Sequence, residues 1–127
     1  MTDVRHTAGR RGEDLAAAHF ERLGFEVLAR NHRTRFGELD VVAASDRVLV
    51  FCEVKTRVGD AGPGPFAPLA AVGGRKQRQV RRMARQWLGE RSTLLGVRPT
   101  ELRFDAIGVT LDTSGRLTGL EHVEDAF

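Results

Sequence analysis

Apolar residues recur along the chain at two periods, and each period predicts its own kind of element. Over residues 12–23 they recur at three and four positions, which predicts a helix that ends at Gly24, with an inward stripe of Ala16, Ala17 and Phe20. Residues 75–91 predict a second helix, whose apolar stripe is Val80, Met83, Ala84, Trp87 and Leu88. Each helix therefore has one face that requires burial.

Strands are predicted over five segments: residues 25–29, 38–44, 47–56, 102–111 and 117–123. Only Ser45 and Asp46 separate the second segment from the third, which indicates a hairpin, and a basic loop is expected over residues 31–36. The order helix, three strands, helix, strand predicts one α/β domain over residues 1–127. We expect a central mixed sheet flanked by helices, with the last predicted strand at the sheet edge.

The strand predicted at residues 47–56 is apolar on both faces, as in a central strand that is covered on both sides. The C-terminal end of this strand is not apolar on both faces, because the charged residues Glu53 and Lys55 lie on the same face as Phe51. An unpaired buried charge is costly, so this pair requires a structural or chemical reason. The Gly- and Pro-rich loop that follows, residues 58–74, is expected to be flexible, either as a segment ordered by substrate or as a plain connector.

The composition narrows the classes of function. The chain has 127 residues, a net charge of +3 and a single cysteine, Cys52, which excludes a disulfide framework and a cysteine-based zinc site. No apolar run reaches the roughly 18 residues of a membrane span and no signal-peptide pattern opens the sequence, so a cytoplasmic protein without a membrane partner is expected. Of the 20 basic residues 18 are arginine, which suits phosphate backbones; a G/C-rich genome is the alternative explanation.

Two carboxylates are predicted to meet on neighbouring strands. The hairpin brings Asp40, on its first strand, towards Glu53, on its second. Carboxylates this close repel each other unless a cation or a proton lies between them. Together with the backbone carbonyl of Val54 and water, they form an all-oxygen donor set that suits Mg²⁺ or Mn²⁺. The alternatives are an ion pair between Asp40 and an arginine, and a solvated strand end at Glu53.

Lys55 and Glu13 are the further candidates for catalysis. Lys55 is expected to point at the same cavity as Glu53, where an ammonium group steadies an attacking hydroxide and offsets charge on a phosphate. Glu13 lies on the inward stripe of the first predicted helix and could complete the site directly or through a metal-bound water. As a plain first-turn acid it would only interact with the helix dipole.

Basic side chains gather in two predicted segments. The second helix carries arginines three and four residues apart, an arrangement that is mildly unfavourable unless an anion meets it. Lys76 and Gln79 extend the apolar stripe of this helix and should point to the end of the sheet. Nucleic acid, DNA rather than RNA, is the expected partner, and a solvated helix face is the alternative. The candidate nucleic-acid contacts are Arg33, Arg35, Arg75, Lys76, Arg78, Gln79, Arg82 and Arg85.

Several other polar residues are expected to be structural. Glu38 shares a strand face with Asp40 but is expected to pair with Arg33 or Arg35, and Asp105 is expected in an ion pair. The four histidines show no metal-ligand spacing. The residues expected in the core despite their chemistry are Cys52 and Trp87.

The order of these motifs resembles a known group of nucleases. Asp40 followed by Glu53-Val54-Lys55 is similar to the catalytic core of the PD-(D/E)XK nuclease superfamily. Gly12-Glu13 and Gln79-Val80-Arg81, on the two flanking helices, resemble its Holliday-junction-resolvase-like branch. More closely, the chain resembles the YraN-like proteins, through Arg11-Gly12-Glu13, Asn31, Gly37-Glu38-Leu39-Asp40, Phe51-Cys52-Glu53-Val54-Lys55 and Arg103-Phe104-Asp105.

The resemblance covers about residues 9–111 and implies a restriction-endonuclease-like fold with an αβββαβ core. It also implies Mg²⁺-dependent hydrolysis of phosphodiester bonds. It implies that Asp40 and Glu53 are metal ligands, that Lys55 is the catalytic lysine and that Glu13 is the helical carboxylate. The expected function is therefore a metal-dependent nuclease acting on DNA, branched or flapped DNA included. The alternatives are a nucleic-acid-binding module and an accessory protein of a DNA-processing assembly. Because junction resolvases act as symmetric dimers, a homodimer is left open.

Overall fold

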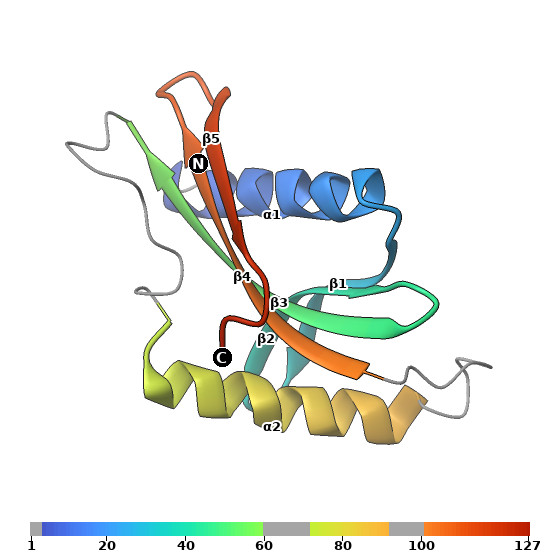
Figure 1. The fold of residues 1–127 in the computed structure, drawn as a ribbon. Coiled ribbons are helices and arrows are strands. Elements are labelled where there is room, and N and C mark those ends of the chain that lie inside the picture. Colours follow the sequence, from blue (N-terminus) through green and yellow to red (C-terminus); the bar gives the residue numbers. More distant parts are fainter. Residues whose placement is uncertain (1–3, 60–71, 92–100) are drawn as a thin grey trace.

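The computed structural model describes residues 4–59, 72–91 and 101–127 (Figure 1). In chain order its elements are α1 (Val4–Arg22), β1 (Glu26–Thr34), β2 (Gly37–Ala44), β3 (Val48–Val58), α2 (Gly74–Arg91), β4 (Glu101–Leu111) and β5 (Leu117–Val123). This order confirms the predicted succession of helix, three strands, helix and strand, and it confirms the predicted last strand.

A five-stranded mixed sheet lies at the centre of the domain, with the strands in the order β1-β2-β3-β4-β5. The pairing of β3 with β4 is parallel and the other three pairings are antiparallel. The two helices lie on opposite sides of the sheet (Figure 1). The structure therefore confirms the predicted α/β domain, in which helices cover both faces of a mixed sheet.

One apolar core fills each side of the sheet, and the alternation along β3 divides its side chains between them. Val50 and Cys52 belong to the core beneath α1, with Phe20. Phe51 belongs to the core beneath α2, where its ring meets the edge of Trp87 with the ring centroids 5.8 Å apart. Cys52 and Trp87 are both buried, as predicted.

The sheet divides into two branches beyond the middle of β3. β2 and β3 are paired only from Ala44↔Leu49 to Val41↔Cys52. Beyond that point β2 stays paired with β1, whereas β3 stays paired with β4 as far as Val58. Asp40 and Glu53 are the first residues of their strands past the last pair. The backbone therefore opens where the sequence places its two candidate metal ligands.

Several predicted boundaries were wrong. α1 begins at Val4 rather than at residue 12, because its first turns are polar and show no apolar period. The loop predicted over residues 31–36 is mostly strand, since β1 continues to Thr34 by pairing with β2, which needs no apolar alternation at a sheet edge. β3 continues to Val58 because its parallel ladder with β4 continues.

The predicted Gly- and Pro-rich loop is only partly covered by the structure. Residues 60–71 lie outside the described residues. Of the remainder, Val58 ends β3 and Gly74 begins α2. None of the helices in the described ranges is long and apolar enough to cross a membrane.

Candidate active site

The carboxylate of Asp40, on β2, lies against β3 at the point where β2 and β3 separate. Its Oδ2 accepts a hydrogen bond of 2.9 Å from the backbone N–H of Val54. Because the N–H and C=O of one strand residue point to the same side, the carbonyl of Val54 also faces the side of Asp40. The predicted donor set of Asp40, Glu53 and the Val54 carbonyl is thus gathered at one place.

Glu53 lies close enough to Asp40 to change the ionisation of Asp40. Burial, and next the negative charge of Glu53, raise the pKa of Asp40 from its usual 3.8 to about 7. The Val54 N–H and the ammonium of Lys76 act in the opposite direction, but they are weaker. Near neutral pH this pair of carboxylates therefore either holds a proton or requires a cation.

Two lysines flank the carboxylate of Glu53, which is only 4% exposed. Nζ of Lys55, on the same strand, lies 3.7 Å from Oε1 of Glu53. Nζ of Lys76, on α2, lies 3.5 Å from the same oxygen. Lys76, predicted as a contact to nucleic acid or to the region of Lys55, is therefore brought to the acidic centre by α2.

Glu13 reaches the site from α1 because Gly12 allows that helix to approach β3 closely. A Cβ at position 12 would lie 3.0 Å from Cβ and 3.1 Å from Cγ2 of Thr56. Burial first, and then the charge of Asp40, raise the pKa of Glu13, while a hydrogen bond from the side chain of Asn31 lowers it. Among the described residues, none supplies a hydrogen-bond partner for the buried Oε2 of Glu13. The first-turn alternative is wrong, since Glu13 lies well inside α1.

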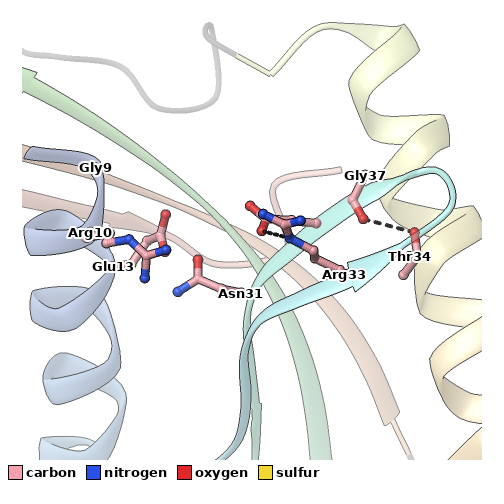
Figure 2. Close-up of a pocket in the computed structure, with 8 residues that line it drawn as sticks. Gly9, Arg10, Glu13, Asn31, Arg33, Thr34 and Gly37 are labelled. Atoms are coloured by element: carbon pink, nitrogen blue, oxygen red, sulfur yellow. Dashed lines mark hydrogen bonds and ion pairs between the residues drawn. The ribbon is translucent and has the colours of Figure 1, made fainter. Parts of the chain in front are cut away.

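A cavity of about 580 Å³ opens between α1 and the β1–β2 hairpin. Figure 2 shows Glu13 and Arg10 of α1 on one side of it, opposite Asn31 and Arg33 of β1. The full lining comprises Gly9, Arg10, Glu13, Asn31, Arg33, Thr34, Gly37 and Glu38. Solvent and ligands thus have access to the Glu13 side of the acidic centre.

The donor set decides which metal this site can hold. Within residues 4–59, 72–91 and 101–127, no three His, Cys, Asp or Glu side chains come together closely enough to enclose a metal ion. Two carboxylates, a backbone carbonyl and water remain, together with the unpartnered Oε2 of Glu13 nearby. Such an oxygen-only set fits Mg²⁺ or Mn²⁺, because Mg²⁺ is usually bound by one or two carboxylates and keeps several waters.

Comparison with known proteins places these residues in a family. The model of the uncharacterised protein family UPF0102 matches residues 12–109, which is most of the chain. The chain belongs to this family. It is 41% identical over 127 residues to a UPF0102 protein of Pelotomaculum thermopropionicum, with the whole of both chains covered. A UPF0102 protein of a Parafrankia species is 46% identical over 98% of each chain, and one of Geobacter sulfurreducens is 45% identical over 94% of this chain and 87% of its own.

The stretch matched by the UPF0102 model contains all four candidate catalytic residues, Glu13, Asp40, Glu53 and Lys55. The names of these UPF0102 relatives state no activity.

The predicted basic contacts lie on the β1–β2 hairpin and on α2. On the hairpin, Arg33 pairs with Glu38 through a 3.2 Å contact, as predicted for Glu38, and Arg35 lies over the ring of Phe36. Arg85 is exposed further along α2. Four of the predicted contacts line one cavity together with Phe36: Arg75, Arg78, Gln79 and Arg82.

The structural role predicted for Asp105 is confirmed. Its fully buried carboxylate accepts two hydrogen bonds of 2.9 Å from Arg103, lies 2.7 Å from Nε2 of His122 and accepts one from the N–H of Asp125. Burial raises the pKa of this carboxyl, but the bonds from His122 and Arg103 more than compensate, so the net pKa is lowered. His122 in turn meets His19 at 3.0 Å. This network ties β4 to β5 and α1.

Two residues of the site region were not recognised from the sequence as functional. Asn31 lies in the left-handed region, with φ of 49°, and its side chain reaches Glu13. Asparagine tolerates this conformation better than most residues, which was the available signal. Phe36 was the end of a predicted loop, and its position between Arg35 and a turn glycine, Gly37, was the signal for a half-buried aromatic at a basic hairpin tip.

Proposed function

We propose that this protein is a Mg²⁺- or Mn²⁺-dependent nuclease that hydrolyses phosphodiester bonds in DNA. Asp40, Glu53 and the backbone carbonyl of Val54 hold the cation. The observation that carries this proposal is the meeting of two like-charged carboxylates at a half-buried fork of the sheet. A protein gains no stability from such a pair unless a cation or a proton offsets the repulsion.

When bound, the cation supplies Lewis acidity, which lowers the pKa of water and neutralises charge on the scissile phosphate. Lys55 donates hydrogen bonds from its ammonium to the attacking water and to a phosphate oxygen that gains charge in the transition state. Lys76 approaches Glu53 from α2 and holds this carboxylate in place. Glu13 lines the cavity, and its buried Oε2, which has no hydrogen-bond partner among the described residues, is left to accept a hydrogen bond from a water of the site.

The resemblance to the PD-(D/E)XK superfamily supports the same proposal. Asp40, Glu53 and Lys55 occupy the positions of that motif, and Glu13 occupies that of the helical carboxylate. One position departs from the pattern, because Leu39 stands where the name of the superfamily has a proline. Leu39 is buried beneath α2, so in this protein it anchors the strand that carries Asp40.

DNA as the substrate is supported by the basic side chains around the site. Arg35 of the β1–β2 hairpin and Arg82 of α2 both lie over the ring of Phe36 at the hairpin tip. Guanidinium groups bind phosphate through paired hydrogen bonds, so contacts to a phosphodiester backbone are favourable here. We place this activity in the cytoplasm, where DNA and Mg²⁺ are both present.

Cleavage of defined oligonucleotides tests the proposal. Single-stranded, duplex, flapped and four-way-junction DNA are incubated with the protein and Mg²⁺, Mn²⁺ or EDTA. We expect cleavage with either metal and none with EDTA. The variants Asp40→Asn and Glu53→Gln should each lower the rate at least a hundredfold, because each removes a ligand of the cation.

The matched control is Asp46→Asn, an exposed carboxylate in the β2–β3 turn, which should cut like the wild type. Equal cutting by the wild type and by Glu53→Ala combined with Lys55→Ala would indicate a contaminating nuclease. Equally tight DNA binding with and without metal, in the absence of any cleavage, would favour the binding-module alternative.

A further inference from the structure

A second cavity lies between the tip of the β1–β2 hairpin and α2, and we call it the Phe36 pocket. Its volume is about 450 Å³, and its lining consists of Phe36, Arg75, Arg78, Gln79 and Arg82. One aromatic ring, one amide and three guanidinium groups thus face a space of the size that small-ligand pockets have. Among the residues that the structure describes, none of those that line this pocket carries a carboxylate.

The aromatic ring in this pocket is held firmly at the hairpin tip. Thr34 Oγ1 accepts a 3.0 Å hydrogen bond from the N–H of Phe36 and donates one of 3.0 Å to the carbonyl of Gly37. The side-chain amide of Gln79 donates to the carbonyl of Phe36 and so ties the tip to α2. Gly37, with φ of 129°, leaves room for this amide, since a Cβ there would lie 2.7 Å from Nε2 of Gln79.

The ring of Phe36 is half-buried, and two arginine guanidinium groups lie over it. The guanidinium of Arg82 lies 5.0 Å from the ring centroid, and that of Arg35 lies 4.9 Å from it. Both arginines are exposed, so either can exchange the ring for another flat partner. Aromatic rings and guanidinium planes are the surfaces on which proteins stack unpaired bases.

The arginines of the pocket, Arg75, Arg78 and Arg82, have no carboxylate partner in the part of the chain that the structure describes. They are three and four residues apart on α2, so they repel each other mildly unless an anion is bound. Phosphate is the anion that best suits several guanidinium groups in a row.

The pocket lies one helical turn from the candidate active site. Lys76, which contacts Glu53, and Gln79, which lines the pocket, are three residues apart on α2, or about 4.5 Å along the helix axis. A strand whose phosphate lies at Asp40 and Glu53 therefore has a neighbouring nucleotide within reach of the pocket.

We propose that the Phe36 pocket binds an unpaired nucleotide of the DNA substrate, next to the bond that is cut. This inference rests on the proposed nuclease function. The base lies against the ring of Phe36, in the place that Arg82 occupies in the free protein. The flanking phosphates lie against Arg75, Arg78 and the displaced Arg82. Because the bases of an intact duplex are stacked on their neighbours and paired, the pocket selects single-stranded, flapped or branched DNA over uninterrupted duplex.

Binding of fluorescent oligonucleotides in EDTA tests this inference without cleavage. The probes are a single-stranded DNA, the blunt duplex of the same sequence and the RNA of the same sequence. The variant is Phe36→Leu, which keeps apolar volume against the core and removes the aromatic face, and Phe36→Tyr restores that face. We expect Phe36→Leu to weaken single-strand binding about tenfold and duplex binding less than twofold. Phe36→Tyr should bind within twofold of the wild type.

Arg116→Ala, in the β4–β5 turn, is the matched control for loss of charge, whereas Arg78→Ala should weaken binding of the single strand. A single strand that carries 2-aminopurine should lose fluorescence on binding to the wild type but not to Phe36→Leu, because stacking quenches this base. Equal weakening of single-strand and duplex binding by Phe36→Leu would overturn the inference, as would tighter binding of the RNA than of the DNA. Cleavage by the wild type in Mg²⁺ is measured separately. A failure of the nuclease proposal is therefore distinguishable from a failure of the proposed nucleotide binding in the Phe36 pocket.

Discussion

The backbone N–H of Val54 donates its hydrogen bond to the side chain of Asp40, at the point where β2 separates from β3. Within a paired ladder, a backbone carbonyl of the neighbouring strand would accept this bond. Here the carboxylate takes over that role, so Asp40 both closes the end of the ladder and stands beside Glu53. The fork thereby holds two acids together on rigid strands.

The first prediction concerns the cost of this arrangement in the absence of metal. Asp40→Asn keeps an oxygen that accepts the Val54 bond but removes the charge facing Glu53. Because the folded pKa of Asp40 is about 7 and its usual value is 3.8, ionised Asp40 destabilises the fold, and the wild type loses stability as the pH rises between these values. In EDTA at pH 8, Asp40→Asn should be more stable by about 1–3 kcal/mol.

Thermal unfolding measures this difference, which should correspond to an increase of several degrees in Tm. The difference should largely vanish at pH 4, where the side chain of Asp40 is neutral in the folded protein. A variant less stable than the wild type at pH 8 in EDTA would show that the repulsion between Asp40 and Glu53 is already offset by Lys55 and Lys76.

The second prediction concerns the pH dependence of metal binding. Since Mg²⁺ requires the ionised carboxylate, binding below pH 7 must release the proton of Asp40. The apparent affinity for Mg²⁺ should rise up to about tenfold per pH unit as far as pH 7 and level off above it. Titration calorimetry at pH 6.5 in buffers of different ionisation enthalpy measures the released proton. An affinity for Mg²⁺ that does not change between pH 5.5 and pH 8 would contradict this prediction.

The third prediction concerns the close approach of α1 to β3. Gly12→Ala adds a methyl group against Thr56, which should lower the free energy of unfolding by about 1–3 kcal/mol and slow cleavage by displacing Glu13. Combining Gly12→Ala with Thr56→Ala should restore part of the lost stability and part of the lost cleavage rate. The control is Gly9→Ala in the same helix, where a Cβ meets no atom within 4 Å and helix propensity alone should add stability. Similar effects of the two glycine variants would show that the contact with Thr56 is unimportant.

The fourth prediction concerns the buried network around Asp105. Asp105→Asn removes the buried charge partner of Arg103, which keeps the 3.7 Å contact with the exposed Glu124, and should lower the free energy of unfolding at pH 7 by about 3 kcal/mol. Because the folded pKa of Asp105 is lowered, its contribution is complete above pH 4 and is lost as the pH falls through the folded pKa. Urea unfolding across pH 2.5–7 should therefore show the two proteins converging at low pH. A difference in the free energy of unfolding that stays constant across this pH range would contradict the prediction. The control is Asp46→Asn, which changes an exposed carboxylate.

The sequence predicted the central part of the fold because its apolar periods are strong there. The two-sided apolar pattern of β3 ended at Glu53, and the structure confirmed this strand as central and Glu53 as buried. The early start of α1 and the length of β1 were not predictable in the same way. Both depend on backbone hydrogen bonds made by polar segments, and Asn31 interrupts the alternation of β1 with a left-handed residue.

The site was predictable as a set of residues but not as a geometry. The spacing of Asp40 and Glu53 on a hairpin predicted their meeting, yet nothing local indicated that the strands part at that point. The contact of Lys76 with Glu53 depends on how α2 packs across the sheet, which is a tertiary property. Gly12 and Asn31 act through other side chains, so their roles became clear only from the positions of Thr56 and Glu13.

Anomalous diffraction from crystals soaked in Mn²⁺ shows whether Asp40 and Glu53 bind one cation together. We expect one strong peak with carboxylate oxygens of both Asp40 and Glu53 at about 2.1 Å, and the loss of this peak in Asp40→Asn crystals. A Mn²⁺ ion bound at another place would contradict the proposed metal site. So would the absence of a Mn²⁺ peak at saturating metal, with Lys55 and Lys76 still in contact with Glu53.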